Sequence, residues 1–561
     1  MEKMTIRYLQ EGYRSQAFTV EEVIDQLLAR IKEYADYNIW LQVLDKAEIM
    51  TYVEALEATG PQNKPLWGIP FAIKDNIDLA QVPTTAACPK FSYIPEKSAV
   101  VVQQLIQAGA IPIGKTNMDQ FATGLVGTRS PHGATKNALN PELISGGSSS
   151  GSAVAVALGQ VCFSLGTDTA GSGRVPAALN NIVGYKAALG SYSTEGVVPA
   201  CESLDCVSVF ANTTEDIQRI DQQLSSLNKT AESKAPQKIF LPDRLEFFGP
   251  FAKLYELSWK QTVTYFKENA EVELVSMADI QQVARSLYEG PFVVEREVAI
   301  GDFANKHPEA IIGPLATILQ QAQQTDYSAK QLFEAQHFCQ QVEARVKQKL
   351  KGSLLLLPTC TGTWRIDQVQ ADPIFTNSQM GLYTNHCNLL NLSAIAIPAP
   401  VDSKLPFGIT LFAAPEEEAM LKSYAAEIEQ QQRKTKLVVC GLHMRGFPLE
   451  KDLLAHGAEF YREAKTANCY RLYELKTEIR KPALVKVDDQ GAKIEVEVWQ
   501  IPDTAFSSFI QTIPYPLGIG QVELEDGEEV LGFICQQVAK EDVHEITEFG
   551  SWRNYQLKGI F

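Results

Sequence analysis

The stretch SGGSSSGS, at residues 145–152, carries the strongest structural signal in this sequence. Runs of Gly and Ser are usually flexible linkers, but this run lies between apolar segments of a compact region, which favours a loop inside a domain. A second loop of small residues, GTDTAGSGR at residues 166–174, follows it. Glycine lets the backbone approach a ligand closely, and successive N–H groups in such loops can point to one oxyanion. The two loops therefore predict a site that binds a negatively charged oxygen.

Short apolar runs bounded by turn residues surround these loops and predict buried strands. They lie at residues 66–73, 110–114, 161–165, 353–358 and 394–398. Helical patterns alternate with them and cover residues 19–58, 100–109, most of 275–350, and 416–432. The first helical stretch starts at a capping box formed by Thr19 and Glu22. Strands that alternate with helices indicate the α/β class.

A polar stretch at residues 430–436 marks a change in the character of the chain. Beyond it, residues 493–499 alternate apolar and charged side chains, as a half-exposed strand does. We therefore expect a large domain at residues 1–432, whose N-terminal helices occupy residues 1–60. A smaller α+β domain of ordinary size is expected at residues 433–561.

The composition argues against several classes of protein. The 561 residues include 50 Lys and Arg against 67 Asp and Glu, and the formal net charge of −17 argues against an extended nucleic-acid-binding surface. No apolar run reaches the roughly 18 residues of a transmembrane helix, and the N-terminus lacks the apolar segment of a secretory signal. The ten cysteines form no Cys-x-x-Cys pair, and the seven histidines show no metal-ligand spacing. We expect a cytoplasmic protein with reduced thiols and no metal.

A serine nucleophile in these loops would need a base. His132 is the only histidine among the first 300 residues, and nothing in its surroundings marks it as catalytic. A lysine can serve as the base when burial lowers its pKa enough to leave a neutral amine. Lys74 is the candidate, because it ends the apolar run at residues 69–74, where a buried strand meets a polar loop. A surface lysine that follows a strand is the alternative.

Three blocks of sequence together resemble the amidase signature family. The blocks are GIPFAIKD at residues 68–75, GGSSSGS at residues 146–152 and GTDTAGSGR at residues 166–174. Ser148 and Ser172 are 24 positions apart, which also matches the family. The resemblance covers roughly residues 20–430 and implies a large mixed sheet flanked by helices. One departure is Ser150, which stands where the family commonly has glycine.

The resemblance implies a catalytic triad of the Ser–cis-Ser–Lys type. Ser172 would be the nucleophile, and Lys74 would be the terminal base. Ser148, which would follow a cis peptide bond, would relay the proton between them. Arg174 also follows the family pattern; pairing with Asp168 is its favoured role, and substrate binding is the weaker alternative. The N–H groups of an oxyanion hole would belong to Thr169, Ala170, Gly171 and Ser172.

Further motifs are similar to those of the allophanate hydrolases within this family. The string VPACESLDC at residues 198–206 matches them in detail and accounts for Cys201 and Cys206 as packing residues. Tyr288 and Arg296 lie eight residues apart, near two helical turns, so we expect them to share one helix face. A tyrosine and an arginine at this spacing contact the substrate's carboxylate in allophanate hydrolases, a task that suits a guanidinium. A solvated helix face is the alternative.

Gly124 and the C-terminal region complete the resemblance. Gly124 is expected to line the substrate pocket through its backbone. Residues 441–449 and 513–520 resemble the extra domain of allophanate hydrolases, which has a γ-glutamyl cyclotransferase-like fold and is implicated, in some members, in decarboxylating the first product. His443, with Arg445 close by, is the candidate for a site there, and a structural role for this histidine is the alternative.

The resemblance implies hydrolysis of the terminal amide of allophanate, which releases ammonia and N-carboxycarbamate, a product that then loses carbon dioxide. No cofactor is required. The expected setting is urea or s-triazine nitrogen catabolism, with functional coupling to urea carboxylase, no contact with nucleic acid or membrane, and a homodimer. Two alternatives stay open: another small-amide hydrolase of the malonamate type, and an amidotransferase-like subunit that supplies ammonia within a complex.

Overall fold

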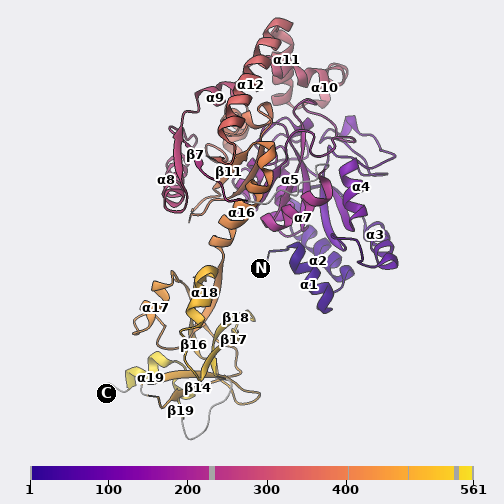
Figure 1. The fold of residues 1–561 in the computed structure, drawn as a ribbon. Coiled ribbons are helices and arrows are strands. Elements are labelled where there is room, and N and C mark those ends of the chain that lie inside the picture. Colours follow the sequence, from indigo (N-terminus) through magenta and orange to yellow (C-terminus); the bar gives the residue numbers. More distant parts are fainter. Residues whose placement is uncertain (1–2, 226–233, 402, 478, 536–542, 559–561) are drawn as a thin grey trace. The chain divides into compact units, whose positions relative to one another are not determined.

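The computed structural model describes residues 3–225, 234–401, 403–477, 479–535 and 543–558. The chain divides into two compact units, Met1–Ala426 and Glu427–Phe561. Figure 1 follows both from indigo at the N-terminus to yellow at the C-terminus. The division falls inside helix α16 (Glu418–Gln432), just before the polar stretch at which the sequence predicts a domain boundary.

A sheet that counts eleven strands among the described residues forms the centre of the first unit. Strand β2 pairs in parallel with β3 and β4, whereas β4 pairs antiparallel with β6, so the sheet is mixed. This confirms the fold class that the sequence predicts. The order across the sheet is β1 (Trp40–Val43), β3 (Ala110–Thr116), β2 (Ile69–Lys74), β4 (Phe163–Asp168), β6 (Cys206–Ala211), β5 (Val183–Lys186), β10 (Ser393–Pro398), β11 (Gly408–Ala413), β9 (Leu354–Pro358), β7 (Ile239–Pro242) and β8 (Val272–Val275).

The central strands are buried along their whole length, which explains why they read as continuous apolar runs rather than alternating ones. Phe71 of β2 and Phe163 of β4, for example, stack with ring centroids 5.2 Å apart. Helices surround the sheet in Figure 1. Those of the first unit, besides α16, are α1 (Ile6–Ser15), α2 (Val20–Glu33), α3 (Lys46–Thr59), α4 (Val100–Gln107), α5 (Ser150–Ala157), α6 (Val175–Leu179), α7 (Thr214–Leu224), α8 (Ala252–Asn269), α9 (Ala278–Glu289), α10 (Val294–Lys306), α11 (Gly313–Gln324), α12 (Ala329–Lys349), α13 (Ile366–Ala371), α14 (Phe375–Met380) and α15 (His386–Leu389).

The N-terminal region corrects one expectation. The sequence predicts helix throughout residues 19–58, but strand β1 lies between helices α2 and α3. This strand has four residues and pairs antiparallel with β3 at the edge of the large sheet. A segment this short shows no clear period of its own, so its pairing partner decides its conformation. The predicted helices of residues 1–60 are therefore interrupted by an edge strand.

The two loops of small residues are shorter than their composition suggests. Ser150 is the first residue of helix α5, and nearly every residue of that helix is buried. Gly166, Thr167 and Asp168 are the last residues of strand β4. Both loops are thus anchored directly to buried elements. This anchoring holds their backbone in place at one edge of the sheet.

The second unit is rich in strands and confirms the expected smaller α+β part. One sheet has the order β13 (Glu459–Lys465), β16 (Glu495–Pro502), β12 (Lys434–Val439), β18 (Glu529–Cys535) and β17 (Leu517–Glu523). The other has the order β15 (Lys481–Lys486), β14 (Tyr470–Leu475) and β19 (Val543–Glu545). Its helices are α17 (Glu450–Ala455), α18 (Asp503–Ile510) and α19 (Trp552–Lys558). Trp499 and Trp552 are almost completely buried and contribute to its core.

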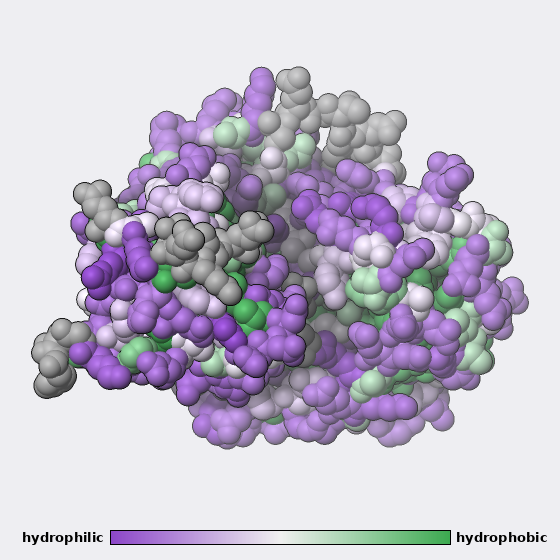
Figure 2. Space-filling model, turned by 90° about the horizontal axis from the view of Figure 1, so that it is seen from below, coloured by the Kyte–Doolittle hydropathy of each residue, from purple (hydrophilic) through white to green (hydrophobic). Residues whose placement is uncertain are grey.

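Hydrophilic side chains dominate the face of the molecule seen in Figure 2, and hydrophobic ones occur there in small, separate groups. No helix within the described residues combines the length and apolarity needed to cross a membrane.

Candidate active site

Strand β2 brings Lys74 to one edge of the large sheet. Lys74 is the last residue of this strand and is 0% exposed. Its amine donates hydrogen bonds to Ser148 Oγ at 2.8 Å and to Thr167 Oγ1 at 2.7 Å. Thr167 lies near the end of β4, which is parallel to β2, so both strands end at the same edge of the sheet. The structure therefore brings the predicted base and the predicted relay serine into contact.

Burial controls the pKa of Lys74. Desolvation disfavours the ammonium form and lowers the pKa from 10.5 to about 7. The carboxylates of Asp119, Asp205 and Asp168 oppose this change because each of them favours the charged amine. A base with a pKa near neutrality is suited to accept a proton at neutral pH.

Ser148 is held by tight backbone packing. The peptide bond between Gly147 and Ser148 is cis. The carbonyl oxygen of Ser148 accepts a hydrogen bond from the Asp119 N–H at 3.0 Å. A Cβ atom added at Gly147 would lie 2.0 Å from Asp119 Oδ2, so only glycine fits at this position.

Ser172 lies in the short loop between β4 and α6. It is 2% exposed, and its Oγ donates a long hydrogen bond of 3.5 Å to the carbonyl oxygen of Gly124. Gly124 thus meets the predicted nucleophile through its backbone. A bond of this length is weak, so the hydroxyl can reorient when a substrate binds.

The four amides predicted for the oxyanion hole differ in their partners. The Gly171 N–H donates to Asp168 Oδ1 at 2.8 Å, so this amide is already engaged. The N–H groups of Thr169, Ala170 and Ser172 have no hydrogen-bond acceptor among the described residues. The geometry therefore leaves three of the four amides for an oxyanion.

Arg174 forms a buried ion pair with Asp168. The Arg174 Nε and Nη2 atoms each lie 2.9 Å from one carboxylate oxygen of Asp168, and both side chains are 0% exposed. Arg174 Nη1 donates to the carbonyl oxygen of Thr384 at 3.2 Å. These contacts favour the structural role of Arg174 over substrate binding, because its donors are committed within the protein.

Tyr288 and Arg296 do not share one helix, contrary to the expectation from their spacing. Helix α9 ends before Gly290, and a 3₁₀ turn at Pro291–Val293 separates it from α10, which carries Arg296. Proline cannot continue the hydrogen bonding of a helix, so the chain turns here. The two side chains still meet: Arg296 Nη2 donates to Tyr288 Oη at 3.1 Å, and the Arg296 guanidinium carbon lies 4.4 Å from the tyrosine ring centroid.

The guanidinium of Arg296 has donors to spare. Its side chain is almost completely buried, yet its Nε and Nη1 atoms have no hydrogen-bond partner among the described residues. Leaving buried charged donors without a partner is costly, so these donors call for an acceptor that the protein itself does not supply. Each of these free N–H groups can donate a charge-assisted hydrogen bond to a carboxylate oxygen.

Three residues that contact this site were not identified from the sequence: Asp119, Arg129 and Thr167. The Asp119 carboxylate accepts hydrogen bonds from the N–H groups of Gly127 at 3.1 Å and Arg129 at 2.8 Å. The signal that could have found it is its position just after β3, which is parallel to β2 and ends at the same edge.

Comparison with known proteins identifies the families that the two parts of the chain match. Residues 22–421 match the family described as Amidase, and residues 435–557 match the family described as Allophanate hydrolase C-terminal domain. The chain belongs to the amidase family. This amidase thus carries a second family domain after the amidase one.

Relatives of this amidase include much longer proteins and one of similar length. Urea amidolyase of Saccharomyces cerevisiae is 38% identical over 92% of this chain, which corresponds to 31% of that protein. Urea amidolyase of Lachancea kluyveri is also 38% identical, over 94% of this chain and 32% of its own length. The solved structure of Kluyveromyces lactis allophanate hydrolase has a TM-score of 0.69 and 34% identity, and 99% of each chain is covered. This amidase therefore spans about a third of the urea amidolyases and nearly all of the allophanate hydrolase.

The second unit of this amidase contains a cavity of about 330 Å³ lined by His443. The imidazole stacks on Phe533, with ring centroids 4.9 Å apart, and burial lowers the pKa of His443 to about 4. Asp452 and Lys481 also line this cavity. His443 is therefore a neutral imidazole in a pocket that also holds one acidic and one basic side chain.

Arg445 has a different environment from His443. Its Nε donates to Glu497 Oε1 at 3.1 Å, and its Nη2 donates to Glu463 Oε1 at 2.6 Å. The guanidinium also lies over the ring of Phe460. Arg445 is not among the residues that line the His443 cavity. The structure therefore does not bring these two predicted residues together in one site.

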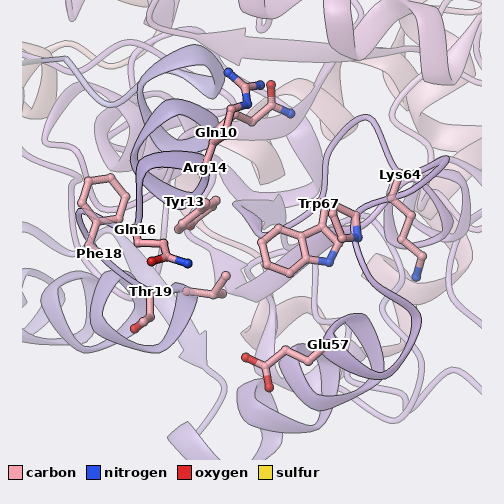
Figure 3. A pocket seen from close by; sticks show the side chains of 11 residues that line it. Gln10, Tyr13, Arg14, Gln16, Phe18, Thr19, Glu57, Lys64 and Trp67 are labelled. Carbon is pink, nitrogen blue, oxygen red and sulfur yellow. The ribbon is translucent and has the colours of Figure 1, made fainter.

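An open groove of about 530 Å³ lies between α1, the start of α2 and the end of α3. Figure 3 shows Tyr13, Phe18 and Trp67 along it, with Arg14 and Lys64 beside them. None of the predicted site residues lines this groove. Within the described parts of the chain, no group of three or more His, Cys, Asp or Glu side chains is arranged to hold a metal ion.

Proposed function

We propose that this amidase hydrolyses the terminal amide of allophanate, the carboxylated form of urea. The observation that carries the proposal is the buried guanidinium of Arg296, which has two donors without partners among the described residues. The contact between Lys74 and Ser148 supports amide hydrolysis in general, whereas a cation with spare donors supports a substrate that carries a carboxylate. Similarity to the K. lactis allophanate hydrolase over 99% of both chains supports the same assignment.

The first chemical step is acylation of Ser172. Neutral Lys74 accepts a proton from Ser148, which in turn accepts the proton of the Ser172 hydroxyl as that oxygen attacks the terminal amide carbonyl. The lowered pKa of Lys74 supports this order, because only the neutral amine can act as the base.

The negative charge then develops on the amide oxygen. The free N–H groups of Thr169, Ala170 and Ser172 are the donors that would stabilise it, and the loss of one such donor typically costs about 10²–10³ in rate. The proton returns to the leaving nitrogen, and ammonia departs. Water then attacks the acyl-enzyme by the same proton path and releases N-carboxycarbamate.

The second unit would receive this product. N-carboxycarbamate loses carbon dioxide, and the cavity around His443 is the candidate place for that step. The match to the allophanate hydrolase C-terminal domain supports this division of labour, in which the two units catalyse successive reactions.

The substrate assignment is tested with Arg296→Gln. We expect kcat/KM for ammonia release from allophanate to fall about 10- to 100-fold, because a charge-assisted hydrogen bond contributes about 1.5–3 kcal/mol. Arg345→Gln, which changes an exposed arginine paired with Asp279, is the matched control. Unchanged turnover of allophanate by Arg296→Gln would overturn the assignment, and Ser172→Ala provides the inactive reference.

The same assay of ammonia release also tests for two other activities. A small-amide hydrolase of the malonamate type would release ammonia faster from malonamate than from allophanate. An amidotransferase-like subunit would be inactive as a purified chain and would require a partner. Full turnover of allophanate by the chain alone, without ATP, distinguishes our proposal from both.

The similarity to urea amidolyases suggests the protein's partners. The chain spans about a third of those relatives, and we propose that it is functionally coupled to a urea carboxylase activity, which would supply allophanate. We further propose that the protein is a cytoplasmic homodimer. Light scattering of the purified chain measures its oligomeric state directly.

A further inference from the structure

A second buried arginine lies close to Arg296. Arg129 is 3% exposed and is located on the loop that follows β3. Its guanidinium is close enough to Arg296 and Tyr288 to interact with both electrostatically. Each arginine also has an anion nearby, because the charge of Asp119 acts on Arg129 and the charges of Asp205 and Glu295 act on Arg296.

The loop contacts of Arg129 hold its guanidinium in one orientation. Nη1 donates to the carbonyl oxygen of Thr123 at 3.2 Å, and Nη2 donates to that of Pro373 at 2.5 Å. The backbone N–H of Arg129 donates to Asp119. Nε, in contrast, has no partner among the described residues. The side chain is therefore fixed at its end and retains one buried donor.

Gly124 links the side chain of Arg129 to the predicted nucleophile. The Arg129 Cδ atom, to which Nε is bonded, would lie 3.0 Å from a Cβ atom added at Gly124. The carbonyl oxygen of Gly124 accepts the hydrogen bond from Ser172 Oγ. Gly124 thus contacts both Arg129 and the reacting serine, and Arg296 approaches from another element.

The nearby carboxylates act on both arginines, yet they leave Nε of Arg129 and Nε and Nη1 of Arg296 without hydrogen-bond partners among the described residues. Asp119 accepts hydrogen bonds from two backbone N–H groups and also acts on Lys74. Asp205 accepts bonds from the Thr169 hydroxyl and from the N–H groups at residues 200 and 201. The unpartnered donors of the two arginines are therefore the observation that fits a ligand with more than one carboxylate.

We propose that Arg129 is a second cation of the substrate site and that, together with Arg296, it selects a small dicarboxylate. The inference rests on the proposed function. Hydrolysis converts the amide end of allophanate into a carboxylate, so the product carries two carboxylates where the substrate carried one. Arg296 binds the one carboxylate of the substrate, and Arg129 binds the carboxylate that the reaction creates.

The test compares binding of malonate, which has the length and charge of the product, with binding of malonamate, which keeps the amide and has one charge. Titration calorimetry on the full chain measures the affinity for each of the two ligands, in the unsubstituted protein and in Arg129→Gln. We expect malonate affinity to fall about tenfold or more and malonamate affinity to change much less. Arg345→Gln should alter neither.

Equal weakening of both ligands in Arg129→Gln would overturn the inference, because it would mean that Arg129 only shapes the loop. Unchanged binding of both would also overturn it. Should Arg129→Gln not fold, Arg129→Lys is used; it keeps the charge but lacks the fixed Nε donor, and we again expect a selective loss for malonate. Ammonia release from allophanate by the unchanged protein tests the proposed function separately, so the two failures are distinguishable.

Discussion

At the scale of single residues, the properties of Lys74 come from its position at the end of a buried strand. The same lysine in solvent would be an ammonium at neutral pH. Burial disfavours that charge, while Asp119, Asp205 and Asp168 partly restore it, and the balance leaves the pKa at about 7. Under the proposed mechanism, the reactivity of the site would depend on the charges around the lysine as much as on the serines.

The pH profile tests this balance. Lys74 must be neutral to act as the base, so kcat/KM for ammonia release should rise with pH through an ionisation near pH 7 and be lost below it. In Asp119→Asn the anion that favours the ammonium form is removed, so this limb should move to lower pH. Asp25→Asn, which changes an exposed carboxylate paired with Lys46, is the control. A limb that stays in place in Asp119→Asn would contradict the prediction.

At the scale of elements, the site exists because several elements end at one edge of the large sheet. Parallel pairing aligns the ends of β2, β3 and β4, and these ends carry Lys74, the loop with Asp119, and the loop with Ser172. Helix α10 carries Arg296, and the break after α9 places Arg296 and Tyr288 on different helices. The loops between these elements have little free space, which makes their glycines sensitive positions.

Gly171→Ala tests how tightly the loop after β4 is held. Gly171 has φ of +137°, and a Cβ atom there would lie 2.3 Å from Thr384 Oγ1. The loop must shift to accept alanine, so the amides around Ser172 should lose their alignment. We expect kcat to fall about 10²-fold or more, comparable to the loss of an oxyanion-hole donor. Gly313→Ala, at which an added Cβ meets nothing within 4 Å, should leave the rate unchanged.

At the scale of the whole molecule, the net charge of the protein and the charge of the proposed substrate are both negative. The net charge of −17 does not attract an anion. Recognition must therefore come from local cations, and Arg296 and Arg129 are both buried. The two units also have separate cores, so each has its own basis for stability.

Removal of the second unit tests the division of labour. A chain that ends at residue 432 keeps the whole large sheet. We expect it to release the first ammonia from allophanate at a rate within a few fold of the full chain, while carbon dioxide release lags behind. His443→Ala in the full chain should show the same lag. If both variants release carbon dioxide as fast as the unchanged protein, the second unit has no role in decarboxylation.

Several strands and the family of this protein could be predicted from local patterns in the sequence. The apolar runs predicted β2, β3, β9 and β10, and the blocks around Ser148 and Ser172 predicted the family. These features were readable because strand burial and glycine-dependent close approach impose their requirements on consecutive residues.

Local patterns were thus enough for the fold class, the family and the choice of Lys74, Ser148 and Ser172 as candidates. The position of β1, the break between Tyr288 and Arg296, the separation of His443 from Arg445, and the place of Arg129 emerged only from the folded chain. The difference lies in the range of the interactions. Periodicity and packing of neighbours in the chain are local, whereas desolvation and the charge around a side chain are set by elements far apart in sequence, which folding brings together.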